Sequence, residues 1–238
     1  LPFWITNLAP EIFAACSKKL MDEKDHMYEY EIDGLIFTPC DLPVGGNIVN
    51  GEPGPLYKNT WNHSFKWKPP KFNTIDFLVT VKKNNKGVDE LHTIFQEGMN
   101  NTSTNVKQYK TLILRCGFDE RKHGYINPCQ DILNDNIPTI NDIDDVETYK
   151  PVPFQPTNPY DAEAYLCNIM LHNSGSKQYM MTEENEYFDE DTIVEFKYVM
   201  DNKEGWKWVP LRVRYDKTAE LRAGLKNYGN AYHVANSN

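Results

Sequence analysis

Two lysines separated by one residue, Lys66 and Lys68, lie in the stretch HSFKWKPPKFNTIDFLV, residues 63–79. If this stretch forms a β-strand, side chains alternate between its faces, so both lysines share one face and Phe65 and Trp67 share the other. Ammonium groups about 6 to 7 Å apart repel each other unless an anion lies over them. The pair therefore predicts a phosphate site, although a solvated edge strand protected by lysines explains the same pattern.

A second group of basic residues ends the stretch LRVRYDK. Arg212 and Arg214 share one face of an expected strand, and Asp216 and Lys217 follow at its end. Guanidinium groups bind phosphate oxygens through two parallel hydrogen bonds, and a lysine adds a compact positive charge. We interpret this group as a second phosphate-binding element, the alternative being the solvated basic end of a strand.

Two carboxylates could accompany these cations. Asp33 precedes Gly34 in EIDGLIF, and a glycine there lets another backbone segment approach closely. An Asp-Gly pair is also a common turn, so this signal alone is weak. Asp76 follows Lys66 by ten residues and is a possible carboxylate partner of the lysine pair.

The elements that must position these residues are mainly strands. Residues 9–21 predict an amphipathic helix, and residues 217–226 predict another that begins a linker. Five further runs rich in β-branched and aromatic residues predict strands: Ile75–Val81, Lys110–Cys116, Tyr165–His172, Thr192–Met200 and Trp206–Arg214. Five strands separated by long polar loops suit a small OB-type barrel, and a β-sandwich fits the same pattern.

Composition narrows the class of protein. The 238 residues are 40% hydrophobic and 13% aromatic, enough for a substantial core. No run of eighteen apolar residues and no signal-peptide pattern occurs, and the five cysteines form no C-x-x-C pair, so we expect a protein of a reducing cytoplasm. The net charge is −9, but residues 131–147 and 183–191 together hold 12 acids and no base, which leaves room for a basic surface elsewhere.

Taken in order, the three motifs show a family resemblance. DGLIF resembles motif IV of the covalent nucleotidyltransferases, FKWKPPKFNTIDF resembles motif V, and RVRYDK resembles motif VI. Within that superfamily, the three motifs most resemble those of the mRNA capping guanylyltransferases. Longer stretches, such as FQPTNPYD and WVPLRVRYDKT, are similar to the multidomain capping enzymes of large cytoplasmic DNA viruses, particularly mimivirus-like ones.

The resemblance implies a two-step reaction. A lysine attacks the α-phosphate of GTP, which gives lysine-GMP and pyrophosphate, and the GMP then moves to the 5′-diphosphate end of mRNA. It also implies Mg²⁺ or Mn²⁺ as cofactor, a cytoplasmic location in a viral factory or virion, no membrane, and triphosphatase and methyltransferase domains in the same polypeptide.

Roles follow for the motif residues. Lys66 and Lys68 would bind the nucleotide phosphates, with Lys68 the better candidate for the α-phosphate, and Asp33 would position the divalent ion or the attacking lysine. The motif VI group would close over the β- and γ-phosphates. The nucleotide-binding set is then Asp33, Lys66, Lys68, Asp76, Arg212, Arg214, Asp216 and Lys217, and the catalytic set is Lys66, Lys68, Arg214 and Lys217.

One family motif is absent. The nucleophilic lysine of the family lies in K-x-D-G before motif IV, and these 238 residues contain no K-x-D-G. Lys226, in KNYG, fits only a looser pattern after motif VI. We therefore expect a fragment: residues 1–76 as the C-terminal part of a nucleotidyltransferase domain, 77–216 as an OB-fold and 217–238 as a linker.

Two other functions fit parts of this pattern. ATP-dependent nucleic-acid ligases share the superfamily, and the choice of base is not readable from these residues. A noncatalytic OB module would bind single-stranded RNA by stacking. That reading requires exposed tryptophans, whereas strand alternation predicts that Trp67 is in the core.

Overall fold

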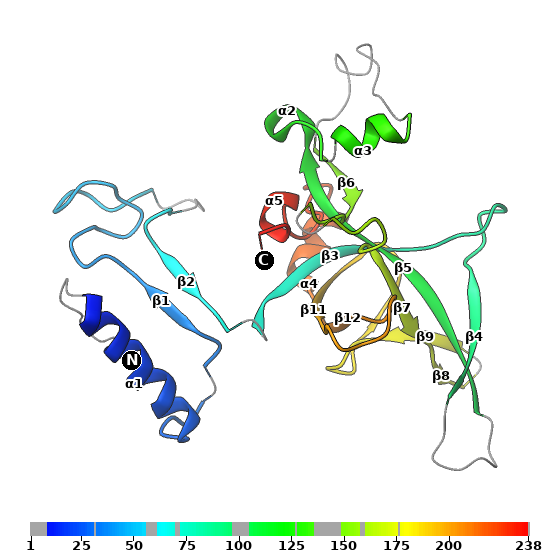
Figure 1. The fold of residues 1–238 in the computed structure, drawn as a ribbon, viewed down its shortest axis with the longest axis horizontal. Helices are drawn as coiled ribbons and strands as arrows, with labels where there is room; N and C mark the ends of the chain where they lie inside the picture. The colour runs from blue at the N-terminus through cyan, green and yellow to red at the C-terminus, as the bar shows by residue number, and fades with distance from the viewer. Residues whose placement is uncertain are drawn as a thin grey trace. The chain divides into compact units, whose positions relative to one another are not determined.

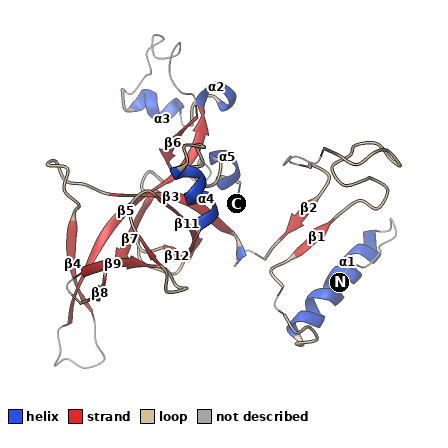
Figure 2. Cartoon of the chain, turned by 180° about the vertical axis from the view of Figure 1, so that it is seen from behind, coloured by secondary structure: helices blue, strands red, loops and turns tan. Residues whose placement is uncertain are grey.

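The computed structural model describes residues 9–30, 32–55, 61–69, 72–96, 105–126, 128–135, 149–157, 160–175 and 177–237. The chain divides into two compact units, Leu1–Phe72 and Asn73–Asn238. Strands dominate and the helices are few (Figures 1 and 2). The predicted class, α+β and mainly β, is confirmed at this level.

The first unit contains helix α1 (Ala9–Lys24) and an antiparallel pair of short strands, β1 (Leu35–Phe37) and β2 (Phe65–Trp67). Helix α1 confirms the helix predicted at residues 9–21. The prediction that Trp67 lies in the core is wrong, because its side chain is 44% exposed. Two strands of three residues have too little surface to bury an indole ring.

The second unit holds ten strands and four helices among its described residues. The strands are β3 (Thr74–Val81), β4 (Leu91–Gln96), β5 (Asn105–Asp119), β6 (Tyr149–Pro153), β7 (Leu166–Met170), β8 (His172–Ser174), β9 (Lys177–Met181), β10 (Tyr187–Phe188), β11 (Thr192–Tyr198) and β12 (Trp208–Val213). The helices are α2 (Glu120–His123), α3 (Pro128–Leu133), α4 (Tyr215–Arg222) and α5 (Tyr232–Ala235). All five strands predicted for this part of the chain are present.

The sheet follows a Greek-key order. Strand β3 pairs with β5 and with β11, β5 also pairs with β7, and all these pairs are antiparallel. Numbered along the chain, these four strands lie in the order 4-1-2-3, which defines the Greek key. Strand β12 pairs with β11 and also contacts β7, so the five predicted strands surround one core (Figure 1). The long strand β5 additionally pairs with β4 and β6.

The core of this unit is built around Phe77 on β3. Its fully buried ring contacts the rings of Phe154, Phe196 and Trp208 at centroid distances of 5.4, 5.9 and 5.0 Å. Burying a large apolar side chain of this kind stabilises a fold by about 1.5–3 kcal/mol. Strand β3 is therefore a rigid support for the polar residue that precedes Phe77 in it, Asp76.

The units divide at different positions from those predicted. The boundary lies between Phe72 and Asn73, because residues 74–81 form one continuous strand that the predicted boundary at 76/77 would cut. Residues 217–238, predicted as a linker, contain most of α4 and all of α5, and Tyr232 and Ala235 are buried in the core of the second unit. The chain after Lys217 thus folds back onto strands β5 and β11 of the second unit.

All five cysteines are free thiols. Burial raises the pKa of Cys167 to about 12, which makes it an inert core residue. In the described part of the chain, no helix is both long and apolar enough to cross a membrane.

Candidate functional site

In the first unit, Asp33 and Lys68 form an ion pair. The register of β1 and β2 sets Leu35 opposite Trp67, so residues 33 and 68 lie just beyond the paired ends of the two strands. The hydrogen bond from Lys68 lowers the pKa of Asp33 below its usual value, and the charge of Lys66 contributes in the same direction. Lys68, a predicted phosphate ligand, is therefore paired with Asp33, the residue predicted to position the divalent ion or the attacking lysine.

Gly34 makes this arrangement possible. A Cβ atom at this position would lie 2.0 Å from the carbonyl oxygen of Trp67, far inside van der Waals contact. Any residue with a side chain would push the two strands apart. The Asp-Gly pair thus serves close backbone approach, as the sequence suggested.

In the second unit, Asp76 accepts hydrogen bonds from two motif VI cations. Nη1 of Arg214 and Nζ of Lys217 lie 2.5 and 2.6 Å from the same carboxylate oxygen of Asp76. The Asp76 side chain is only 7% exposed, whereas those of Arg214 and Lys217 are about one quarter exposed. Two cations at the surface are therefore held by one carboxylate on a core strand.

A row of charges crosses three neighbouring strands beside this group. Asp76 on β3 lies opposite Glu195 on β11, and Glu195 lies opposite Arg212 on β12. Adjacent carboxylates destabilise a sheet unless cations offset them. Glu195 accepts from Nε of Arg212 at 2.7 Å and from the Thr74 hydroxyl at 2.6 Å. Burial alone would raise the pKa of Glu195, but these two hydrogen bonds and the charges of Arg212 and Arg214 together lower it.

Arg214 has a second, weaker carboxylate partner. Its Nε and Nη2 groups lie 3.4 and 3.2 Å from the two oxygens of Asp216, whose side chain is 66% exposed. This hydrogen bonding lowers the pKa of Asp216. Nη1 of Arg214 is therefore bound to the buried carboxylate of Asp76. The edge formed by Nε and Nη2, which offers two parallel donors, contacts only the exposed carboxylate of Asp216.

Asn230 fixes the backbone of Asp76. The Asp76 amide donates to Oδ1 of Asn230 at 2.9 Å, the Asn230 amide donates to the Asp76 carbonyl at 2.8 Å, and the carbonyl of Asn230 accepts from Gly117 at 3.1 Å. Asn230 thereby bridges β3 and β5. It lies 154 positions from Asp76, and sequence reasoning missed it because a Gly-Asn pair signals only a turn.

Gly229 provides a test of this bridge. It has a φ of +87°, and a Cβ atom there would lie 2.2 Å from the Asp76 carbonyl oxygen. Gly87 has a similar φ of +75°, but nothing lies within 4 Å of its Cβ position. Both alanine substitutions incur the left-handed backbone penalty of about 1–2 kcal/mol.

We expect Gly229→Ala to lower the free energy of unfolding by clearly more than Gly87→Ala. Only the Cβ atom added at Gly229 also pushes the segment that contains Gly229 and Asn230 away from β3. Urea unfolding of the two variants measures the difference. Equal losses would show that the segment does not depend on close contact with Asp76.

The structure thus sorts the predicted residues into two groups. Asp33, Lys66 and Lys68 belong to the first unit, and Asp76, Arg212, Arg214, Asp216 and Lys217 form one cluster in the second. The prediction of Asp76 as a partner of the lysine pair is corrected, because Arg214 and Lys217 hold its carboxylate and Lys68 pairs with Asp33. Glu195 is an addition that the sequence did not single out.

In the first group, one residue, Asp33, is a suitable ligand for the predicted divalent ion. Among the described residues, no three His, Cys, Asp or Glu side chains gather as a metal site. Asp33 offers an exposed carboxylate, and Mg²⁺ is commonly bound by one or two carboxylates together with substrate phosphates. The donor set therefore fits an ion that nucleotide phosphates help to hold.

Comparison with known proteins tests the predicted resemblance. The chain is 28% identical over 212 residues to a protein of Acanthamoeba polyphaga mimivirus described as a probable mRNA-capping enzyme. The chain is similar to a probable viral mRNA-capping enzyme. The matched region covers 87% of this chain but only 14% of that relative. The predicted resemblance to capping enzymes of large DNA viruses is thereby confirmed, while no protein-family model and no solved structure matches the chain.

Proposed function

We propose that this chain is part of an mRNA guanylyltransferase, which transfers GMP from GTP through a lysine-GMP intermediate to the 5′-diphosphate end of RNA. The observation that carries the proposal is the similarity to a probable mRNA-capping enzyme along 87% of the chain. The three motifs lie inside this chain, and their residues form two charged groups of the kind that phosphates require.

The first group would act at the α-phosphate. A lysine outside these 238 residues would attack the α-phosphorus of GTP, forming a P–N bond as the bond to pyrophosphate breaks. A β-phosphate oxygen of the RNA would then displace the lysine. Lys66 and Lys68 would stabilise the charge that develops on the α-phosphate oxygens. Asp33 would hold Mg²⁺ or Mn²⁺, whose charge would further offset that of the phosphates.

The motif VI group would bind the β- and γ-phosphates. Arg212, Arg214 and Lys217 carry three positive charges, and Asp76, Glu195 and Asp216 balance them in this structure. A phosphate therefore has to replace a carboxylate. Asp216 is the weakest competitor because it is exposed and its contacts are long, so a phosphate would take the two-donor edge of Arg214 while Asp76 keeps the other edge in place.

The strand order supports the proposed domain type. A Greek-key arrangement of five strands around one core, with β12 next to β7, is what an OB-fold barrel requires. We therefore infer that the second unit is an OB-fold. The first unit would be the end of a nucleotidyltransferase domain, and the triphosphatase and methyltransferase domains of a longer polypeptide stay predictions.

The test is formation of the covalent intermediate. Incubating this chain with α-³²P-labelled GTP and a divalent ion should give no labelled protein band on a denaturing gel, because K-x-D-G is absent from its sequence. A longer capping polypeptide that includes K-x-D-G should give one, and unlabelled GTP should compete better than ATP. A label on the present chain alone would refute the assignment of the nucleophile. Preferential competition by ATP would favour a ligase.

A further inference from the structure

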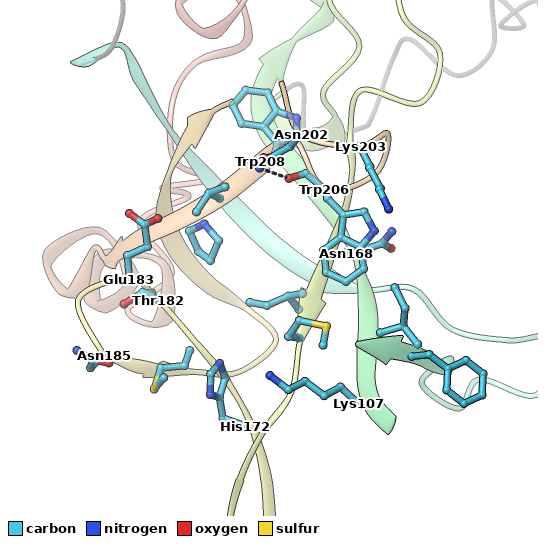
Figure 3. A pocket seen from close by; sticks show the side chains of 17 residues that line it. Lys107, Asn168, His172, Thr182, Glu183, Asn185, Asn202, Lys203, Trp206 and Trp208 are labelled. Carbon is cyan, nitrogen blue, oxygen red and sulfur yellow. Dashed lines mark hydrogen bonds between the residues drawn. The ribbon is translucent and has the colours of Figure 1, made fainter. Parts of the chain in front are cut away.

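A pocket of about 730 Å³ lies on the second unit, and its lining includes none of the residues of the charged clusters described above. Strands β4, β5, β7 and β12 contribute to it, together with the end of β9 and the turn that connects β11 to β12 (Figure 3). Most of its lining is apolar, and its size falls within the range of small-ligand sites, about 300–1,000 Å³.

Trp206 and Phe95 are aromatic residues of the lining, and other rings support Trp206. Trp206 contacts the ring of Tyr109 at a centroid distance of 5.2 Å, and Tyr109 stacks on His92 at 5.0 Å with an interplanar angle of 26°. Phe95, on β4, is 68% exposed at the pocket. Trp206 lines the pocket and is partly exposed (Figure 3), and its contact with Tyr109 holds the indole ring in place, so a planar ligand could pack against it.

The charges of the lining favour an anionic ligand. Glu183 is already paired with Lys197 at 2.6 Å. Lys107 and Lys203 have no carboxylate partner in the described part of the chain, and both extend along the pocket (Figure 3). Because Lys197 offsets Glu183, Lys107 and Lys203 give the lining a positive charge, although the chain as a whole has a net charge of −9.

An amide adds a directional group. Oδ1 of Asn168 accepts from the Thr111 hydroxyl at 2.7 Å, which orients the side chain and leaves its NH₂ group as a donor. Asn168 lies next to Trp206 in the pocket (Figure 3). A ligand stacked on Trp206 would therefore find a hydrogen-bond donor at its edge.

We propose that this pocket binds one or two nucleotides of single-stranded RNA. Bases would stack on Trp206 and Phe95, Lys107 and Lys203 would bind the flanking phosphates, and Asn168 would donate to a base edge. Stacking platforms combined with basic groups are how proteins hold single strands. The inference rests on the proposed function, because the RNA strand would be the capping substrate held downstream of its 5′ end.

Fluorescence anisotropy of the 238-residue chain with a 5′-fluorescein-labelled ten-nucleotide RNA of mixed sequence tests this. Trp206→Ala should weaken binding about tenfold or more, the loss typical of one stacked base, and Trp206→Phe should retain most of the affinity. Lys107→Gln and Lys203→Gln should each reduce the slope of log affinity against log salt by about 0.7. Tyr125→Ala and Lys86→Gln, exposed residues outside the pocket lining, should change neither quantity.

Urea unfolding of each variant shows whether it is folded. If Trp206→Ala does not fold, the two lysine variants still test the inference. Absence of RNA binding at millimolar protein, or an affinity unaffected by the pocket variants, would overturn the inference. If the pocket variants changed the sedimentation of the chain but not its RNA affinity, the pocket would be a protein interface, and the inference would also be overturned. The RNA-binding assay does not depend on GMP transfer. If the labelled-GTP test failed but RNA binding still depended on the pocket residues, only the proposed catalytic function would be refuted.

Discussion

Lys68→Ala in a capping polypeptide that includes K-x-D-G is expected to slow formation of lysine-GMP about 10²-fold or more. The variant removes a cation that stabilises charge developing on the α-phosphate, and such groups contribute on that scale. Loss of the fold does not explain a decrease of this size. The Asp33–Lys68 pair is exposed, and exposed ion pairs stabilise proteins by about 0–1 kcal/mol.

The measurement is the single-turnover rate of adduct formation at saturating GTP. Lys18→Ala, which removes another exposed lysine of the first unit, is the matched control and should leave the rate unchanged. Lys68→Arg should keep the positive charge and recover part of the rate. An unchanged rate in Lys68→Ala would mean that the lysine serves only to neutralise Asp33 at the strand ends.

The strands that the sequence predicted are those whose side chains form the core of the second unit. Thr192–Tyr198 and Thr74–Val81 consist mostly of β-branched and aromatic residues, and most positions in each are buried. The missed strands have no such signal. His172–Ser174 is short and polar, and Tyr149–Pro153 contains two prolines, which normally argue against a strand; both exist because a neighbouring strand offers a free edge.

The candidate site was predictable only in part, because its partners are set by strand register. Arg212, Arg214 and Lys217 were recognisable from their own spacing. Glu195 was not, since its importance arises from lying between Asp76 and Arg212 on adjacent strands. Nearness along the chain suggested that Asp76 would serve the lysine pair, whereas folding brings it to residues 138 and 141 positions away.

Arg214→Ala is expected to have a different effect from Lys68→Ala. In the proposed mechanism Arg214 orients pyrophosphate as the leaving group, so its loss should slow lysine-GMP formation about 10²-fold or more. Transfer of preformed GMP to RNA involves no pyrophosphate, and its rate should stay largely unchanged. Asp76 would keep Lys217 as a partner, so the variant should remain folded, which urea unfolding checks.

A pair of single-turnover rates, adduct formation and GMP transfer, decides this prediction. Arg222→Ala removes an exposed arginine from the last turn of the same helix region and is the matched control. Arg214→Lys should restore little, because an ammonium group cannot bind Asp76 on one edge and present two parallel donors on the other. If Arg214→Ala slowed both steps equally, Arg214 would act on the fold or on RNA binding, and the assignment of motif VI to the leaving group would be wrong.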